Sequence, residues 1–217
     1  MAMPDEMPLR NAYWIGGGSG AGKTTIARRL AARYGLRLYS TDDVMPDHAA
    51  RCSPDDAPFL NEFKSMGMDE RWVNRSPREM LETFHWFRGE GFSLIVEDLL
   101  RLPEDEGVIV EGFRLLPRLV RPLLAGPGRA VWLLPTPEFR RAAFERRGWD
   151  IPRRTSDPGR ARYNLLERDR MFTDRLMDET TGLGLPAVEV GTAMGEDALA
   201  AQVATAFGLR PARLPRR

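Results

Sequence analysis

The sequence GGGSGAGKTT, residues 16–25, decides the fold. From Gly17 onward it matches the phosphate-loop pattern G-x-x-x-x-G-K-[ST] at every fixed position. A short apolar run over residues 12–15 precedes it, and a helical period that places Ile26 and Leu30 on one face follows it. A glycine-rich turn that matches the pattern by chance would have no reason to lie between a strand and a helix, so this order favours a true phosphate loop.

The residue types of the loop indicate its chemistry. Glycines let successive backbone N–H groups point at a phosphate, whose close approach a Cβ would obstruct. We expect Lys23 to bridge the β- and γ-phosphates of a nucleotide and the Thr24 hydroxyl to ligate Mg²⁺. The predicted site for ATP and Mg²⁺ comprises Gly18, Ser19, Gly20, Ala21, Gly22, Lys23, Thr24 and Thr25.

Five short apolar runs alternate with helical patterns along the chain. This alternation is typical of parallel strands joined by right-handed crossovers. We therefore predict the α/β class, with the doubly wound fold of P-loop NTPases and a five-stranded parallel sheet flanked by helices. The predicted strands cover residues 12–15, 36–39, 107–110, 130–134 and 187–190.

The 217 residues suffice for one domain, which we place at residues 1–209. We expect a helical substrate cap to be inserted at about 45–102, a lid at about 137–170, and a mobile basic tail at 210–217. Within the cap, Ser76-Pro77-Arg78-Glu79 has the features of a helix start. Phe84 and Phe87 follow at helical spacing, so this helix is expected to reach Phe87.

Composition excludes several classes of protein. The net charge is +1, so no overall field favours a polyanion, and nucleic-acid binding has no support. Cys52 is the only cysteine, so no internal disulfide forms. His48 and His85 lack partners at metal-ligand spacing, which argues against zinc. No run approaches the roughly 20 apolar residues that span a bilayer, and we expect a cytoplasmic protein.

Carboxylates follow two of the predicted strands. Ligands of a doubly wound sheet lie beyond the carboxyl ends of its strands, where Asp42, Asp43 and Glu111 are placed. We predict that Asp42 is the base that accepts the proton of an attacking hydroxyl. Asp43 either contacts the substrate or caps the next helix. Glu111 is predicted near Mg²⁺ or the substrate, and the alternative is a buried carboxylate satisfied by backbone donors.

The segments GGSGAGKTT (17–25), LYSTDDV (38–44) and VIVEGF (108–113) resemble the nucleoside kinase group that includes uridine kinase and nicotinamide riboside kinase, within the nucleotide-kinase-like P-loop family. The resemblance implies that Asp42 contacts the acceptor hydroxyl as base and that Glu111 acts like a Walker B carboxylate. It does not extend to residues 45–102. Chloramphenicol phosphotransferase and other small-molecule kinases of the superfamily are compatible as well.

The family also implies arginines that close over the phosphates and neutralise the transferring group. Among the arginines of residues 137–147, we select Arg141 and Arg146 as catalytic. A solvated charged face is the alternative for any one of them. Three further residues near predicted element ends are expected to contact substrate: Arg75, Asp98 and Arg114. Arg140, Arg147, Arg162 and Arg168 are further choices for the lid.

These features favour transfer of the γ-phosphate of Mg-ATP to a hydroxyl of a small molecule, such as a nucleoside, a sugar or an antibiotic-like compound. A GTPase would show an N-K-x-D segment, and the sequence has none. One rival is an ATP-binding regulatory or assembly protein that hydrolyses ATP slowly. Another is a nucleic-acid end kinase, suggested only by Arg210, Arg213, Arg216 and Arg217. The acceptor and the oligomeric state stay open.

Overall fold

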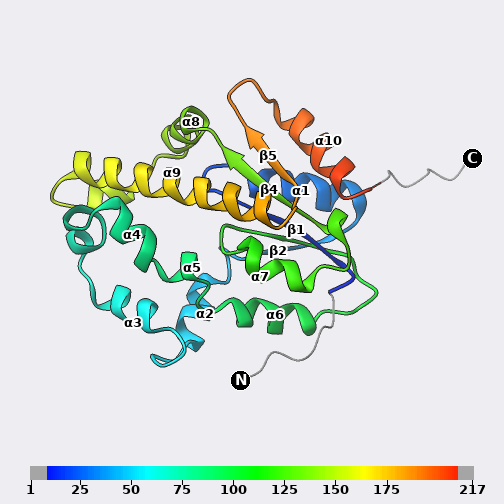
Figure 1. Ribbon diagram of the computed structural model, residues 1–217, viewed down its shortest axis with the longest axis horizontal. Coiled ribbons are helices and arrows are strands. Elements are labelled where there is room, and N and C mark those ends of the chain that lie inside the picture. Colours follow the sequence, from blue (N-terminus) through cyan, green and yellow to red (C-terminus); the bar gives the residue numbers. More distant parts are fainter. Residues whose placement is uncertain (1–8, 210–217) are drawn as a thin grey trace, which may run out of the picture.

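The computed structural model describes residues 9–209 and contains one parallel sheet with the strand order β2-β3-β1-β4-β5 (Figure 1). The predicted fold class and all five strands are confirmed, with bounds that differ from prediction by two residues at most. The predicted tail, with Arg210, Arg213, Arg216 and Arg217, lies outside the described residues. The strands are β1 (Ala12–Gly17), β2 (Arg37–Ser40), β3 (Val108–Glu111), β4 (Ala130–Pro135) and β5 (Ala187–Val190).

Helices cover both faces of this sheet and fill the segment between β2 and β3 (Figure 1). Among the described residues, no helix is both long and apolar enough to cross a membrane. The α-helices are α1 (Lys23–Tyr34), α2 (Met45–Arg51), α3 (Pro58–Ser65), α4 (Pro77–Thr83), α5 (His85–Arg88), α6 (Phe92–Leu100), α7 (Pro117–Val120), α8 (Pro137–Arg147), α9 (Pro158–Gly182) and α10 (Glu196–Ala206). The shorter helical turns are η1 (Glu70–Asn74), η2 (Arg121–Leu123), η3 (Pro127–Arg129) and η4 (Ile151–Arg154).

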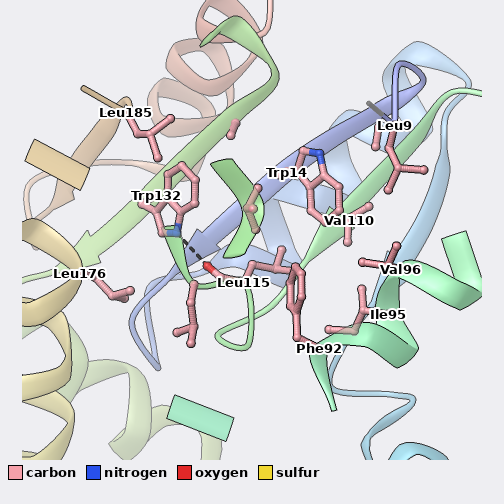
Figure 2. Packing of buried hydrophobic residues seen from close by; sticks show 14 of the residues in the cluster. Leu9, Trp14, Phe92, Ile95, Val96, Val110, Leu115, Trp132, Leu176 and Leu185 are labelled. Atoms are coloured by element: carbon pink, nitrogen blue, oxygen red, sulfur yellow. Dashed lines mark hydrogen bonds between the residues drawn. The ribbon is translucent and has the colours of Figure 1, made fainter. Parts of the chain in front are cut away.

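Alternate residues of the central strands face opposite layers, as the period of two dictates. Trp14, Val110 and Trp132 point toward α6, α7 and α9, where they meet Phe92, Ile95 and Leu176 (Figure 2). The Trp132 indole N–H donates to the carbonyl oxygen of Leu115 at 2.8 Å, so this large side chain is buried with its polar atom bonded (Figure 2).

The other face of the sheet packs against α1 and α10. Ile15, Ile109 and Val131 contact this layer, in which Ile26 and Val203 are buried. The sheet is therefore apolar on both faces, as expected for a parallel sheet covered by helices. The buried polar residues of the strands, Ser40 and Glu111, lie at the carboxyl ends of β2 and β3.

Residues 45–102, which we call the cap segment, form α2 to α6. The start of α4 is confirmed, since the Ser76 hydroxyl accepts a hydrogen bond from the Glu79 N–H at 3.2 Å. The prediction that this helix reaches Phe87 is wrong. Phe84 has an extended backbone (φ −70°, ψ 112°), which ends α4 and starts α5. At this break the Phe84 ring packs against the rings of Phe63 and Phe113.

Candidate active site

The loop between β1 and α1 has the backbone of a phosphate cradle. Gly20 and Gly22 adopt left-handed conformations, with φ of 80° and 82°, that other residues rarely adopt. A Cβ on Gly17 would lie 2.1 Å from the Leu133 carbonyl oxygen, and one on Gly18 would lie 2.6 Å from Thr173 Oγ1. The glycines are thus required both by the turn and by close packing against β4 and α9. A loop of this shape fits a phosphate group.

Lys23 lies at the first position of α1 and is buried. Its ammonium donates to the Gly18 carbonyl oxygen at 2.9 Å, across the loop. Burial lowers the pKa of Lys23, and the carboxylates of Asp42 and Glu111 oppose that shift. A buried ammonium with one carbonyl partner is well suited to exchange that partner for phosphate oxygens.

Glu111 ends β3 and is fully buried, with two hydroxyl groups bound to one of its oxygens. Ser40 donates to Oε1 at 2.7 Å and Thr24 donates to the same atom at 3.1 Å. The other oxygen, Oε2, is buried and has no hydrogen-bond partner among residues 9–209. Burial raises the pKa of Glu111, although the Ser40 bond and the Lys23 charge lower it. An unpaired buried carboxylate oxygen beside a threonine hydroxyl is a donor set that suits Mg²⁺.

No group of three or more His, Cys, Asp or Glu residues that could hold a metal by itself occurs within the described range. Mg²⁺ does not require such a group, because it commonly binds through one or two protein oxygens together with substrate phosphates. Thr24 and Glu111 are the residues that would hold it here.

Asp42 lies in the turn after β2, and this turn is tied to the end of β3. The Thr41 N–H donates to the Glu111 carbonyl oxygen at 2.9 Å. Burial raises the pKa of Asp42, and the Lys23 ammonium is the largest effect in the opposite direction. Asp43, its neighbour, is exposed. The structure therefore brings Asp42, Glu111 and Lys23 into one electrostatic cluster and leaves Asp43 at its edge.

Arg114 is buried three residues beyond β3 and joins the sheet to the cap segment. It donates to the carbonyl oxygens of Thr41 (3.4 Å) and Gly91 (3.1 Å), and its guanidinium lies 4.0 Å from the centre of the Trp86 ring. Burial lowers the pKa of Arg114 to about 10. Arg75 lies elsewhere, within the cap segment, where it contacts Glu79 and Thr83.

Of the arginines considered on α8, Arg140 makes a hydrogen bond to the loop between β1 and α1. Its Nε donates to the Ser19 carbonyl oxygen at 3.3 Å, and Nη2 donates to the Thr173 hydroxyl of α9. Only 1% of Arg140 is exposed, and burial lowers its pKa. Arg140 therefore holds α8, α9 and the loop together.

The arginines selected from the sequence lie on opposite faces of α8. Arg146 lines a cavity of about 330 Å³ beside the phosphate loop, together with Arg147, Phe139 and Met194. Arg141 lines a different cavity, of about 420 Å³, toward η4 and α9. Only the first cavity includes residues of the phosphate loop.

The two arginines considered on α9 are paired within the protein. Arg162 donates to Glu145 of α8 at 2.7 Å and lines the second cavity. Arg168 is buried and donates through Nε and Nη2 to Asp169, while its Nη1 has no hydrogen-bond partner in the described part of the chain. Its guanidinium lies 4.9 Å from the centre of the Phe84 ring.

Sequence reasoning did not single out Ser40, His48 or Phe139, and it did not prefer Arg140 over the other arginines. Ser40 ends β2, immediately before the Thr41-Asp42 turn. This position at a strand end could have identified it as a site residue. His48 and Phe139 had no such signal, because their partners are distant in the sequence. Phe139 lines the cavity beside the phosphate loop, and His48 contacts Arg114.

No family model matches the sequence, and no curated protein matches it. Solved structures do. A deoxyadenosine kinase from M. mycoides with bound dATP is 10% identical, with a TM-score of 0.50 over 91% of this chain and 99% of that chain. The same kinase with products bound is 11% identical, with a TM-score of 0.52 over 91% of this chain and 98% of that chain. A gluconokinase from Sinorhizobium meliloti 1021 is 16% identical over 93% and 94% of the two chains, with a TM-score of 0.49.

At these identities the likeness concerns the fold alone. The chain shares the fold of this deoxyadenosine kinase over 91% of its length. The narrower resemblance to uridine kinase and nicotinamide riboside kinase stays a prediction, as does the role of each site residue.

Proposed function

We propose that the protein is a phosphotransferase that moves the γ-phosphate of Mg-ATP to a hydroxyl group of a small molecule. The observation that carries this proposal is the cluster at the carboxyl ends of β1, β2 and β3. There Glu111 binds the hydroxyl of Thr24, the neighbour of Lys23. The turn that carries Asp42 is bonded to the Glu111 carbonyl oxygen through the Thr41 N–H. Phosphate binding, metal binding and proton acceptance thus fall within one small region.

The phosphates of the donor would bind to the backbone N–H groups of residues 17–22 and to Lys23. The Lys23 ammonium would then exchange its hydrogen bond to the Gly18 carbonyl oxygen for bonds to phosphate oxygens. Thr24 and Oε2 of Glu111 would hold Mg²⁺, which neutralises charge on the phosphate oxygens when bound. The base of the nucleotide would enter the cavity of about 330 Å³ lined by Phe139, Met194 and Arg146. Adenine as this base rests on the resemblance to the kinase group.

Asp42 would orient the acceptor hydroxyl and take its proton. As the hydroxyl oxygen bonds to the γ-phosphorus, the bond from that phosphorus to the oxygen bridging it to the β-phosphate breaks, and ADP leaves. Burial of Asp42 supports this role, because a carboxylate with a raised pKa is a stronger base. Arg140 would keep the loop in place, and Arg146 with Arg147 would face the phosphates. Arg141, Asp43, Arg75 and Arg114 stay proposed contacts from the sequence.

The regulatory rival predicts an apolar patch for a partner on residues 72–102. Within that range Leu100 is the one large apolar side chain that is clearly exposed, at 47%. A single exposed leucine is ordinary for a protein surface. The structure thus gives this rival no specific support, and the end-kinase rival rests on arginines outside the described residues.

The test is ADP production by the purified protein with Mg-ATP and a panel of nucleosides, sugars, aminoglycosides, chloramphenicol-like compounds and small phosphorylated acids. Lys23→Ala is the blank. We expect at least one acceptor to raise ADP production well above that blank. A slow rate that no acceptor changes would contradict the proposal and favour the regulatory reading.

A further inference from the structure

We propose that His48 is a positioning residue for this transfer: it holds the Arg114 guanidinium against the turn that carries Asp42, and Asp98 holds His48. The inference rests on the proposed function, because it concerns the surroundings of the group proposed as base. It is carried by a chain of hydrogen bonds that crosses from α6 through α2 to the end of β2.

Arg114 is enclosed, with 2% of its surface exposed. Its Nη1 lies 3.0 Å from His48 Nδ1 and 3.4 Å from the Thr41 carbonyl oxygen, and its Nη2 lies 3.1 Å from the Gly91 carbonyl oxygen. Even the backbone of Gly91 is constrained here, because a Cβ on it would lie 3.3 Å from Arg114 Nη2. Of these partners, His48 is the only side chain that bonds the guanidinium within residues 9–209.

The hydrogen bonds fix the tautomer of His48. A guanidinium only donates, so the imidazole Nδ1 that faces Arg114 must be bare and accepting. The proton of the neutral ring then lies on Nε2, which donates to Asp98 Oδ2 at 2.8 Å. Asp98 also accepts from the Tyr39 hydroxyl at 2.7 Å, and its other oxygen accepts from Arg51. Asp98 is thereby fixed as an acceptor, which holds His48 in the form that Arg114 needs.

The consequence reaches Asp42 through geometry and charge. Arg114 binds the carbonyl oxygen of Thr41, the residue before Asp42, and its positive charge also lowers the pKa of Asp42 against the effect of burial. Without an acceptor at residue 48, Nη1 would keep only the longer bond to Thr41. The Arg114 guanidinium and the Thr41-Asp42 turn that it binds would then be less firmly positioned.

The chain provides a matched control in its other histidine. His85 also belongs to the cap segment and is 2% exposed, but it packs among the rings of Phe63, Phe84 and Trp86. Its Nδ1 has no hydrogen-bond partner among the described residues, and burial lowers its pKa to about 3. His85 thus shares burial with His48 but not the contact with Arg114.

The first test is NMR of the full chain labelled with ¹⁵N-histidine, which gives signals from only two imidazoles. We expect His48, assigned with His48→Asn, to carry its proton on Nε2 and to leave Nδ1 as an acceptor. In Arg114→Leu the Nδ1 signal of His48 should shift by more than either signal of His85, which is reached by the Arg114 charge but makes no hydrogen bond to it. A proton on Nδ1 of His48, or an Nδ1 signal unmoved in Arg114→Leu, would overturn the inference.

The second test compares kinetics of His48→Leu, His48→Asn and His85→Leu with the best acceptor of the panel. Loss of a hydrogen bond to a charged group predicts about a 10- to 100-fold lower kcat in His48→Leu, with an unchanged KM for ATP. Asn places an oxygen near the Nδ1 position and should restore most of the rate. Equal rates for His48→Leu and His85→Leu, or no rescue by Asn, would overturn the inference. An inactive wild-type protein would instead overturn the proposed function, and the NMR result would still decide the role of His48.

Discussion

The charged groups on the phosphate side of the site and two charged groups of the cap segment differ in how many hydrogen-bond partners they have. At the phosphate side, Glu111 keeps one buried oxygen without a partner among residues 9–209, and Lys23 bonds only a loop carbonyl. In the cap segment, Arg75 and Asp98 are each held by several partners. Groups with few partners can take up a ligand, whereas fully bonded groups maintain a shape. The difference supports our proposal that the chemistry takes place at the sheet edge and that the cap segment positions the groups that perform it.

The largest expected effect is at Lys23, because it would bridge the phosphates. Lys23→Ala should lower acceptor-dependent ADP production by about 1,000-fold or more. The Arg28→Ala variant, which changes a cation on the other side of α1, serves as control and should keep the wild-type rate. Acceptor-dependent ADP production at the wild-type rate in Lys23→Ala would contradict the proposal that Lys23 binds the phosphates of the donor.

Asp42→Asn should have the next largest effect. The amide keeps the shape of the side chain but cannot accept a proton, so we expect kcat to fall by about 100- to 10,000-fold while ATP binding is spared. Burial raises the pKa of Asp42. The base works when deprotonated, so the fall of wild-type kcat toward acid pH should begin above the range of an ordinary aspartate. Normal turnover in Asp42→Asn would exclude Asp42 as the base.

Glu111→Gln tests the free carboxylate oxygen. The amide can still bond the hydroxyls of Ser40 and Thr24, but it loses the negative charge that would help to hold Mg²⁺. We expect activity at limiting Mg²⁺ to fall by about 10- to 100-fold and to recover partly as Mg²⁺ is raised. A loss that is independent of Mg²⁺ concentration would place Glu111 in a purely structural role.

The smallest effect should come from a change within the cap segment that only affects stability. Ser76→Ala removes the cap of α4 and should lower the free energy of unfolding by about 1 kcal/mol, measured by urea denaturation. Acceptor-dependent activity at 25 °C should stay at the wild-type level. The matched variant is Ser65→Ala, which removes the hydrogen bond from the Ser65 hydroxyl to the Glu62 carbonyl oxygen within α3. It should lower the free energy of unfolding by less than Ser76→Ala. A large loss of turnover in Ser76→Ala would contradict the expectation that this change in the cap segment affects stability alone.

The sequence predicted what local patterns determine. The glycine loop and the strand ends could be placed because each depends on a few adjacent residues. The sequence did not predict which face of α8 lies against the phosphate loop. That depends on tertiary packing, which brings Arg140 to Ser19 and Thr173. The break at Phe84 likewise depends on rings from Phe63 and Phe113. The His48 and Arg114 contact joins residues 66 positions apart, and no local period indicates it.

The most direct test of the central claim is ³¹P NMR of Mg-ATP incubated with the protein and each acceptor of the panel. The proposed function predicts that the γ-phosphate signal of ATP is replaced by that of a phosphate ester of one acceptor, in step with ADP, and that neither appears with Lys23→Ala. Inorganic phosphate as the only new product besides ADP, with every acceptor in the panel, would show transfer to water and contradict the claim.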